Sequence, residues 1–363
     1  MYRWIKYVID ILMMYLVFTV CDMPGMKKYV VITFLMCVLL LLGRKKRWSA
    51  DVLLTISLPV VTYLCIGMIT TFFNASEYIT TIKIIAFWLV PLLFALSLYV
   101  FYEKQMPRII DIQFISSCLV YLITKGRFIL ETITVESMFA YVYGAFFIYY
   151  AHKKRWCFCA IAGLLMMLTD KRIVILAVLI AVFVQLILWI FRNDKRVAYS
   201  IWAMTGVFTS VYIWLIYSGV LEALCKGFGI NTNGRVKMYG NVAEWFARPF
   251  AVSGNGLGIV EMLLTSWNVE KFSNLHNDLL KFYIELGFLG FILLLISYGV
   301  MFYRVEKTYG MSQMKLFLSM SVYTMILFAT DNVSIYIIYL IPIYSIYFAI
   351  LSEKSEKEKT KIT

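Results

Sequence analysis

The sequence predicts an all-α, polytopic transmembrane helical bundle, and two observations support this prediction. Of the 363 residues, 62% are hydrophobic, whereas a soluble domain is roughly 45–50% apolar. Several apolar runs reach the length of about 20 residues that a membrane-spanning helix needs. A helix pairs every backbone polar group within its own segment, as lipid requires. The runs also lack the alternation typical of a transmembrane β-barrel.

We predict about twelve spans and treat residues 1–363 as a single integral membrane domain. The spans are placed near 4–20, 29–43, 50–73, 84–102, 109–123, 136–151, 157–169, 173–191, 198–219, 279–302, 315–330 and 333–350. The first run lacks a small-residue cleavage site, so we expect a retained helix and not a signal peptide. The seven Cys are scattered, which predicts neither a disulfide framework nor a zinc site.

Basic residues alternate between the two sides of this arrangement. The two termini and every second connection hold 21 of the 34 Lys and Arg residues, and the opposite short connections hold seven. Lys and Arg accumulate on the cytoplasmic side of a membrane. We therefore expect a multi-pass protein of the inner (cytoplasmic) membrane with both termini cytoplasmic, including the charged tail 351–363. The net charge of +13 then reflects topology, and we expect no nucleic-acid partner.

The apolar run 157–169 is short for a span. As a helix its 13 residues extend about 20 Å, against about 30 Å of hydrocarbon. Either the helix begins inside the preceding basic cluster, or its outer end stops below the outer surface. In the second case Arg172 lies at the floor of an outward-facing cavity, and an ionisable group at that depth is a functional candidate. The alternative is an ordinary hairpin turn with an Arg that reaches the surface.

The segment 220–277 is too polar to be a span, and we predict that it is an extracytoplasmic loop. Residues 234–246 place apolar side chains on one helical face, which suits a short amphipathic helix lying in the outer interface. These side chains are Met238, Tyr239, Val242, Trp245 and Phe246. The run Gly254–Gly258 follows, where closely spaced glycines allow close approach of the backbone to a ligand. A plain turn is the alternative.

His276 is one of two His residues and precedes the tenth span on the outer side. A helix N-terminus favours anions and disfavours imidazolium. A neutral imidazole there can act as a general base or bind a phosphate, and an exposed boundary His is the alternative. Asp278, Lys281 and Glu285 share one helical face, which predicts an intrahelical charge ladder. Glu285 lies on the face opposite His276 and about 13 Å deeper, so we expect it to be structural.

Three segments in order resemble the O-antigen polymerase and O-antigen ligase superfamily, over about 165–300. The first is Thr169-Asp170-Lys171-Arg172 with the apolar run that follows. The second is Gly234-Arg235 with Trp245, Pro249 and the glycine run. The third is His276-Asn277 with Glu285-x-Gly287 and Gly290. Two features depart from the family: Asp170-Lys171 replaces a small residue before the Arg, and the outer loop is short.

The resemblance implies a glycosyltransferase that needs no metal and no cofactor. It would polymerise oligosaccharide repeat units, carried on undecaprenyl pyrophosphate, into O-antigen, capsular or exopolysaccharide chains at the outer face of the inner membrane. Besides the lipid-linked oligosaccharide and membrane lipid, a chain-length regulator and a flippase of the same pathway are expected partners. The catalytic candidates are His276, Arg172 and Arg235, gathered in one outward-facing pocket. The substrate-binding candidates are Asn277, Lys171, Lys237, Gly254 and Gly256.

Three other functions stay open at this point. An O-antigen-type ligase, which passes the glycan to a lipid or protein acceptor, has the same motifs. A flippase for lipid-linked oligosaccharides belongs to a different class, and it usually shows internal repeats and broken helices near the midplane. We find no clear repeat between the two halves of this sequence. A membrane subunit without chemistry would not require basic residues and a His on one outer face.

Overall fold

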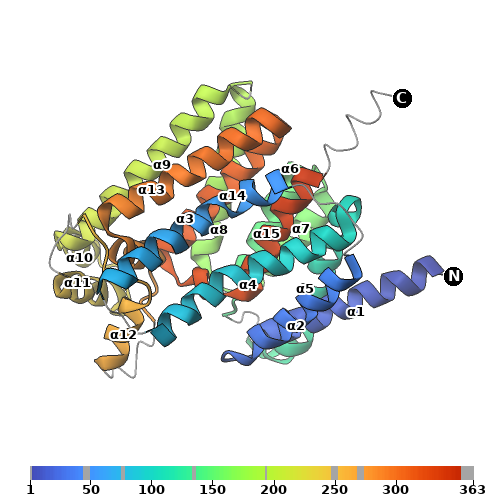
Figure 1. Cartoon of the computed structure of the whole chain (residues 1–363), viewed down its shortest axis with the longest axis horizontal. Coiled ribbons are helices and arrows are strands. Elements are labelled where there is room, and N and C mark those ends of the chain that lie inside the picture. Colours follow the sequence, from blue (N-terminus) through green and yellow to red (C-terminus); the bar gives the residue numbers. More distant parts are fainter. Residues whose placement is uncertain are drawn as a thin grey trace.

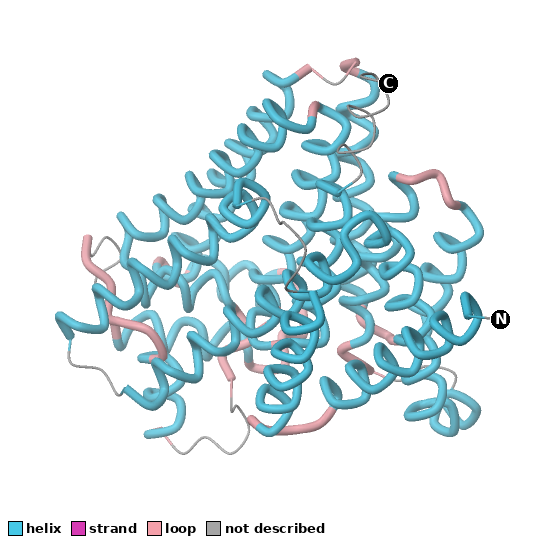
Figure 2. The backbone as a smooth tube through the Cα atoms, turned by 45° about the vertical axis from the view of Figure 1, so that its right-hand side comes forward, coloured by secondary structure: helices cyan, strands magenta, loops and turns pink. Residues whose placement is uncertain are grey.

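The computed structural model describes residues 2–43, 50–74, 78–132, 136–192, 194–246, 252–267 and 274–352. Within these ranges the secondary structure is helical and contains no strand (Figure 2). The helices are α1 (Tyr2–Asp22), α2 (Lys27–Gly43), α3 (Ala50–Asn74), α4 (Tyr78–Tyr102), α5 (Met106–Thr132), α6 (Phe139–His152), α7 (Trp156–Leu168), α8 (Arg172–Ile190), α9 (Lys195–Tyr217), α10 (Val220–Gly227), α11 (Arg235–Trp245), α12 (Ile259–Ser266), α13 (Asp278–Tyr309), α14 (Met311–Thr330) and α15 (Ile337–Ser352), with 3-10 turns at Glu103–Gln105 and Val333–Ile335.

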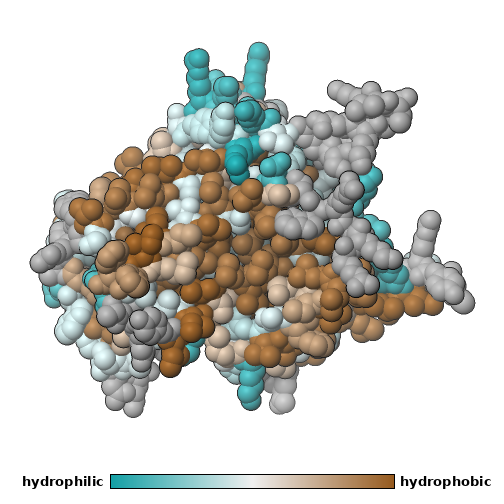
Figure 3. All heavy atoms as spheres, in the orientation of Figure 1, coloured by the Kyte–Doolittle hydropathy of each residue, from teal (hydrophilic) through white to brown (hydrophobic). Residues whose placement is uncertain are grey.

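Each segment predicted as a span overlaps one of these helices, namely α1–α9 and α13–α15. By length and composition, six stretches of the described chain are able to cross a membrane: Trp4–Asp22, Ala50–Asn74, Ile79–Gly126, Arg172–Ile190, Lys195–Tyr217 and Asp278–Tyr309. Figure 3 shows a broad hydrophobic surface along the bundle, with hydrophilic residues at its margins. The all-helical class is confirmed, and the count of twelve spans stays a prediction.

The short helix α7 starts at Trp156, directly after Arg155, and ends at Leu168. The structure therefore does not extend it into the basic cluster before it, which was one of the two alternatives. Helix α7 lies against α6, a helix of 14 residues. Both helices of this pair are short. In the turn after α7, Asp170 is exposed, whereas Lys171 is partly buried beside Glu136, just before α6.

The predicted outer loop 220–277 contains α10, α11 and α12, which lie together at one end of the bundle (Figure 1). The predicted amphipathic helix is confirmed as α11, but its apolar face is not free to lie in a lipid interface. Met238, Tyr239 and Val242 are buried in a small core shared with α12 and the start of α13. Trp245 is 64% exposed. Pro249 lies outside the described residues.

Candidate active site

The carboxylate of Asp331 is the centre of a buried polar cluster. Asp331 follows α14 directly, and its side chain is 5% exposed. Its Oδ1 accepts hydrogen bonds from His276 Nδ1 at 2.9 Å and from the Asn332 backbone N–H at 2.8 Å. Its Oδ2 contacts the Tyr141 hydroxyl and lies 3.4 Å from Lys171 Nζ. These partners come from α6, from the turn before α8 and from the segment before α13, so three distant parts of the chain meet at one group.

The partners of Asp331 keep it ionised. Burial would raise the pKa of this carboxyl, but the hydrogen bond from His276 and the charge of Lys171 outweigh burial and hold the pKa below its ordinary value. An ionised carboxylate only accepts hydrogen bonds. His276 Nδ1 therefore carries the proton that is donated to Asp331. In the neutral imidazole, Nε2 then has a free lone pair, which is the arrangement of a general base oriented by a carboxylate.

Positive charge lies next to this histidine. Lys171 Nζ bridges Asp331 and Glu136, with 2.7 Å to Glu136 Oε1, and lies 5.3 Å from the centre of the Tyr141 ring. The hydrogen bond and charge of Lys171, followed by the charge of Arg235, hold the pKa of Glu136 below its ordinary value. Arg235 is the first residue of α11 and is half-buried. The structure thus brings His276, Lys171 and Arg235 to one end of the bundle.

Two residues in or next to the Asp331 cluster have a backbone in the left-handed region. His276 has φ +54° and Asp170 has φ +47°. Such a conformation costs a residue with a side chain about 1–2 kcal/mol. The carbonyl of His276 is held by the Tyr239 hydroxyl at 2.7 Å, and Asp170 sets the turn that delivers Lys171. Four other non-glycine residues have the same conformation outside this cluster, namely Glu103, Lys154, Arg192 and Asn233, so the strain alone does not mark the site.

The remaining site predictions fall in different places. Arg172 is exposed at the first turn of α8, and Lys237 is exposed on α11. Neither makes a hydrogen bond or ion pair to Asp331 among the described residues. Asn277 is fully buried and caps α13, because its Oδ1 accepts from the Leu280 backbone N–H at 3.0 Å. The roles predicted for these residues in substrate binding or catalysis stay predictions.

Asp278, Lys281 and Glu285 of the predicted charge ladder along α13 are turned toward the protein and buried, but their direct hydrogen bonds and ion pairs are made with other elements. Lys281 pairs with Glu261 of α12. Asp278 accepts from the Ser334 backbone N–H at 2.8 Å and from its hydroxyl at 2.6 Å. Glu285 accepts from the Tyr63 hydroxyl at 2.5 Å and from the Gly258 N–H at 2.7 Å. Glu285 is fully buried, and its hydrogen bonds come from Tyr63 and Gly258 and not from His276. This agrees with its predicted structural role.

The glycine run holds a loop against a break in α13. Gly287 has φ +74° inside that helix, and the chain around Gly254 lies directly on the break. Asn255 N–H donates to the Ile284 carbonyl at 3.0 Å, and Gly256 N–H donates to the Glu285 carbonyl at 3.2 Å. The backbone N–H groups of Asn255 and Gly256 therefore hold the loop against α13. The substrate-binding role predicted for Gly254 and Gly256 stays untested.

We expect Gly254→Ala to destabilise the protein. A Cβ at this position would lie 2.0 Å from the Glu285 carbonyl oxygen, so the loop must move or α13 must distort. Overpacking of this kind typically costs about 1–3 kcal/mol. Thermal unfolding in detergent should show a lower Tm for Gly254→Ala. Gly240→Ala on α11 is the control, because no atom lies within 4 Å of the added methyl group; equal Tm values for the two variants would contradict this account.

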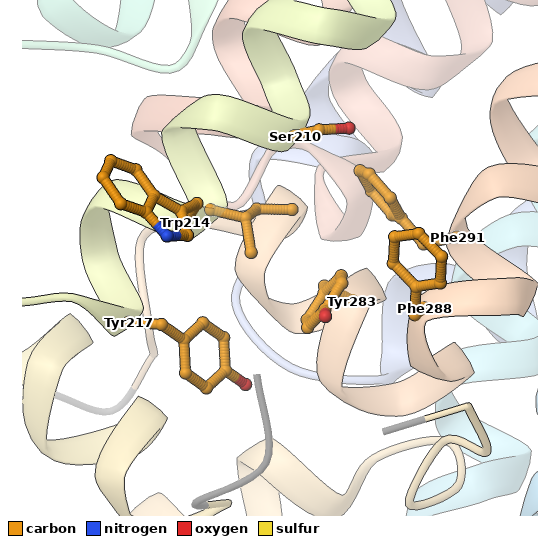
Figure 4. A pocket seen from close by; sticks show the side chains of 7 residues that line it. Ser210, Trp214, Tyr217, Tyr283, Phe288 and Phe291 are labelled. Carbon is orange, nitrogen blue, oxygen red and sulfur yellow. The ribbon is translucent and has the colours of Figure 1, made fainter. Parts of the chain in front are cut away.

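An apolar groove of about 530 Å³ runs between α8, α9 and α14. Along α9 it extends from Ile201 to Tyr212, which is about 16 Å of helix. Its end reaches the polar cluster: Tyr212 donates to the Ala329 carbonyl at 2.7 Å and accepts from Asn277 Nδ2 at 3.0 Å. Thr330, which also lines the groove, precedes Asp331. A smaller aromatic pocket lies between α9 and α13 (Figure 4), lined by Trp214, Tyr217, Tyr283 and other residues.

A comparison with protein families bears on this part of the chain. Residues 157–295 match the O-antigen ligase family. The resemblance indicated by the three motifs is confirmed over these residues. The O-antigen ligase match contains Lys171, Arg172, Arg235 and His276, but Asp331 and Tyr141 lie outside it. A comparison with curated proteins found no match.

Sequence reasoning missed Asp331 and Tyr141, two residues of the cluster that lie outside the O-antigen ligase match. Asp331 stands between two predicted outer span ends, at 330 and 333. A carboxylate in so short a connection was a usable signal, because ionisable groups near membrane spans tend to be functional. Tyr141 gave no signal, since it is one of 26 Tyr residues inside an apolar run.

Proposed function

We propose that this protein is a glycosyltransferase that polymerises lipid-linked oligosaccharide repeat units at the outer face of the inner membrane. The observation that carries the proposal is the His276–Asp331 pair beside Lys171, at the end of an apolar groove. The O-antigen ligase match supports a polymerase or ligase type of glycan transfer. The donor would be an oligosaccharide on undecaprenyl pyrophosphate.

The proposed reaction begins at the free nitrogen of His276. Nε2 takes the proton of an acceptor sugar hydroxyl while that oxygen attacks the anomeric carbon of the donor. The bond between this carbon and the pyrophosphate oxygen breaks, and the carrier pyrophosphate leaves with the bonding electron pair. Negative charge grows on the leaving group, so cations placed there stabilise the transition state. Arg172, Arg235, Lys171 and Lys237 are the proposed cations, and guanidinium groups suit phosphate because they bind it in a fork.

The groove suits the carrier chain of such a donor. Its lining is almost entirely aliphatic and aromatic, and its polar end is formed by Tyr212 and Thr330. A polyprenyl chain lying along α8 and α9 would place its pyrophosphate beside the His276 cluster. A water-soluble donor would not need an apolar groove at this position. This arrangement supports a lipid-linked donor over a nucleotide sugar.

The two alternatives to a polymerase are a ligase, which differs in the acceptor of the glycan, and a flippase, which forms no glycosidic bond. A ligase would use the same donor site and a lipid or protein acceptor. A flippase would need a path that is open to each side in turn, whereas the charges described here gather at one end of the bundle. We therefore propose the polymerase, with the ligase as the second candidate, and a chain-length regulator and a flippase as pathway partners.

The test is the distribution of polysaccharide chain lengths, which appears as a ladder of bands, in a host whose gene is deleted and complemented with each variant. His276→Ala should leave chains of a single repeat unit, because loss of a general base costs roughly 10²–10⁴-fold in rate. The matched control is His152→Gln, which changes the other His of the chain and should keep the ladder. Membrane levels of each variant are compared by immunoblot. A full ladder from His276→Ala at normal protein level would refute the proposed role.

A further inference from the structure

A second chamber lies on the other side of the cluster, between α4 and α12. Its volume is about 540 Å³, which is within the range of ligand-binding pockets. One wall comes from α4 with Thr80, Lys83 and Phe87, and another comes from α12. Figure 1 shows α12 beside the first turns of α4 at the end of the bundle that carries α10 and α11.

The lining of this chamber combines charged, hydroxyl and aromatic groups. Lys83 is exposed on α4, and Glu261 is half-buried on α12. The Thr265 and Ser266 hydroxyls donate to the backbone carbonyls of Glu261 and Leu263 at 2.7 Å, and their lone pairs can accept from a ligand. The Phe87 ring is half-buried. A carboxylate accepts hydrogen bonds from neighbouring hydroxyls, an ammonium donates to them, and an aromatic face packs against an apolar one. These groups together fit a ligand with many hydroxyls and apolar ring faces, which is a sugar.

One carboxylate oxygen of Glu261 accepts no hydrogen bond from any group of the described residues. Its Oε1 is bonded to Lys281, whose side chain is 4% exposed. Its Oε2 is buried without a hydrogen-bond partner in the part of the chain that the structure describes. Buried polar atoms are nearly always paired, so the Glu261 carboxylate keeps unused capacity to accept a hydrogen bond at the edge of the chamber. Lys281 fixes this carboxylate in place, and Glu261 lines the chamber.

The chamber and the His276 cluster share a wall. The wall is the short segment Asp331–Ile335, which follows α14. Asp331 contacts His276 on one side, whereas Ile335 lines the chamber. Asn332 connects them, because its N–H donates to Asp331 and the residue lines a small cavity together with Glu261. Sugars bound in the chamber would lie within a few residues of the reacting centre.

We propose that this chamber is a saccharide-binding subsite that holds sugar units of the growing glycan away from the reacting bond. Lys83 and Glu261 are the specificity-determining residues. The inference rests on the proposed function, since it assumes that the substrate is an oligosaccharide. The sugar units could belong to the donor or to the acceptor, and the chemistry of recognition is the same for both.

Binding of free sugar tests the subsite without catalysis. The probe is the repeat-unit oligosaccharide released by mild acid from the lipid-linked intermediates of the host, titrated by calorimetry into full-length protein in lipid nanodiscs. Ser266→Trp should fill the chamber and weaken binding by roughly tenfold or more. Lys83→Gln, a change at an exposed position, should weaken it by about threefold. Lys226→Gln on α10 is the matched control and should bind as the wild type does.

Extension of a labelled free oligosaccharide separates the two sources of the sugar. If the chamber holds the acceptor, Ser266→Trp raises the KM for the free oligosaccharide. If it holds the donor, Ser266→Trp raises the KM for the lipid-linked substrate. Either result supports the subsite. Wild-type affinity in both Ser266→Trp and Lys83→Gln would overturn it.

The two proposals fail in distinguishable ways. His276→Ala should abolish extension but leave oligosaccharide binding unchanged. An intact ladder from His276→Ala, with binding lost in Ser266→Trp, would refute the catalytic role and keep the subsite. Loss of the ladder in His276→Ala, with normal binding in both chamber variants, would refute the subsite alone.

Discussion

Asp331→Asn is expected to reduce polymerisation by roughly two to four orders of magnitude while the protein stays folded. The amide cannot satisfy every partner of the carboxylate. If its NH₂ group takes the place of Oδ1, it meets the N–H groups of His276 and Asn332. If it takes the place of Oδ2, it meets the ammonium of Lys171. The first orientation favours the imidazole tautomer with its proton on Nε2, which cannot act as a base.

A spectroscopic measurement distinguishes this positioning role from a structural one. The chain has only two His residues, so ¹⁵N-labelled His in a His152→Gln background reports on His276 alone. The wild type should show the proton on Nδ1, and Asp331→Asn should shift it toward Nε2. Asp170→Asn is the control, because this exposed carboxylate lies near Lys171 and should change neither tautomer nor rate. Unchanged tautomer and unchanged rate in Asp331→Asn would contradict the assignment.

The direction in which the pKa of Asp331 is shifted decides how the stability of the folded protein depends on pH. A carboxyl whose folded-state pKa is lowered stabilises the folded protein above its unfolded pKa and loses that contribution as the pH falls through the folded value. Burial would raise the pKa of Asp331, but the hydrogen bond from His276 and the charge of Lys171 outweigh burial and hold this pKa below its ordinary value. The contribution of this network is therefore complete at neutral pH. It declines once the pH falls below the unfolded-state pKa of the carboxyl, and it is gone below the folded-state pKa.

The fold was largely predictable because hydropathy alone decides where helices form in such a chain. The twelve predicted segments coincide with α1–α9 and α13–α15, since the apolar runs are long and charges interrupt them. What hydropathy does not contain is the shape of each helix. The break in α13 at Gly287 depends on a loop more than 30 residues earlier, at Gly254, which packs onto it. No local pattern predicts that contact.

The site was predictable only in part, for a related reason. Charge reasoning found Lys171 and His276, which stand out as polar residues at the ends of apolar runs, and the resemblance added Arg235 in the outer loop. The partner of His276 was missed, because Asp331 is 55 positions away in the sequence and belongs to no motif that we recognised. Asn277 and the glycines were singled out for ligand binding. The structure shows them capping a helix and packing a loop, which are roles that a motif does not distinguish from binding.

Arg172→Ala is expected to collapse the polysaccharide ladder to a single repeat unit without loss of the protein. The side chain is exposed at the first turn of α8, so its removal leaves no cavity and no unpaired buried group. Its proposed role is to stabilise charge on the departing pyrophosphate, and loss of one such donor costs roughly 10²–10³-fold. Arg172→Lys should recover little activity, because an ammonium does not bind phosphate in the forked geometry of a guanidinium.

Arg192→Ala is the matched control, since Arg192 follows the opposite end of the same helix and is also exposed. The predicted topology puts Arg172 outside and Arg192 in the cytoplasm, so only the first can reach a donor in the outer leaflet. The ladder should therefore disappear in one variant and persist in the other, at equal protein level. If both variants keep the ladder, Arg172 is not the phosphate-binding cation, and Lys171, which contacts Asp331 directly, takes that role. If both lose it, the side of the membrane assigned to the two ends of α8 does not explain the activity.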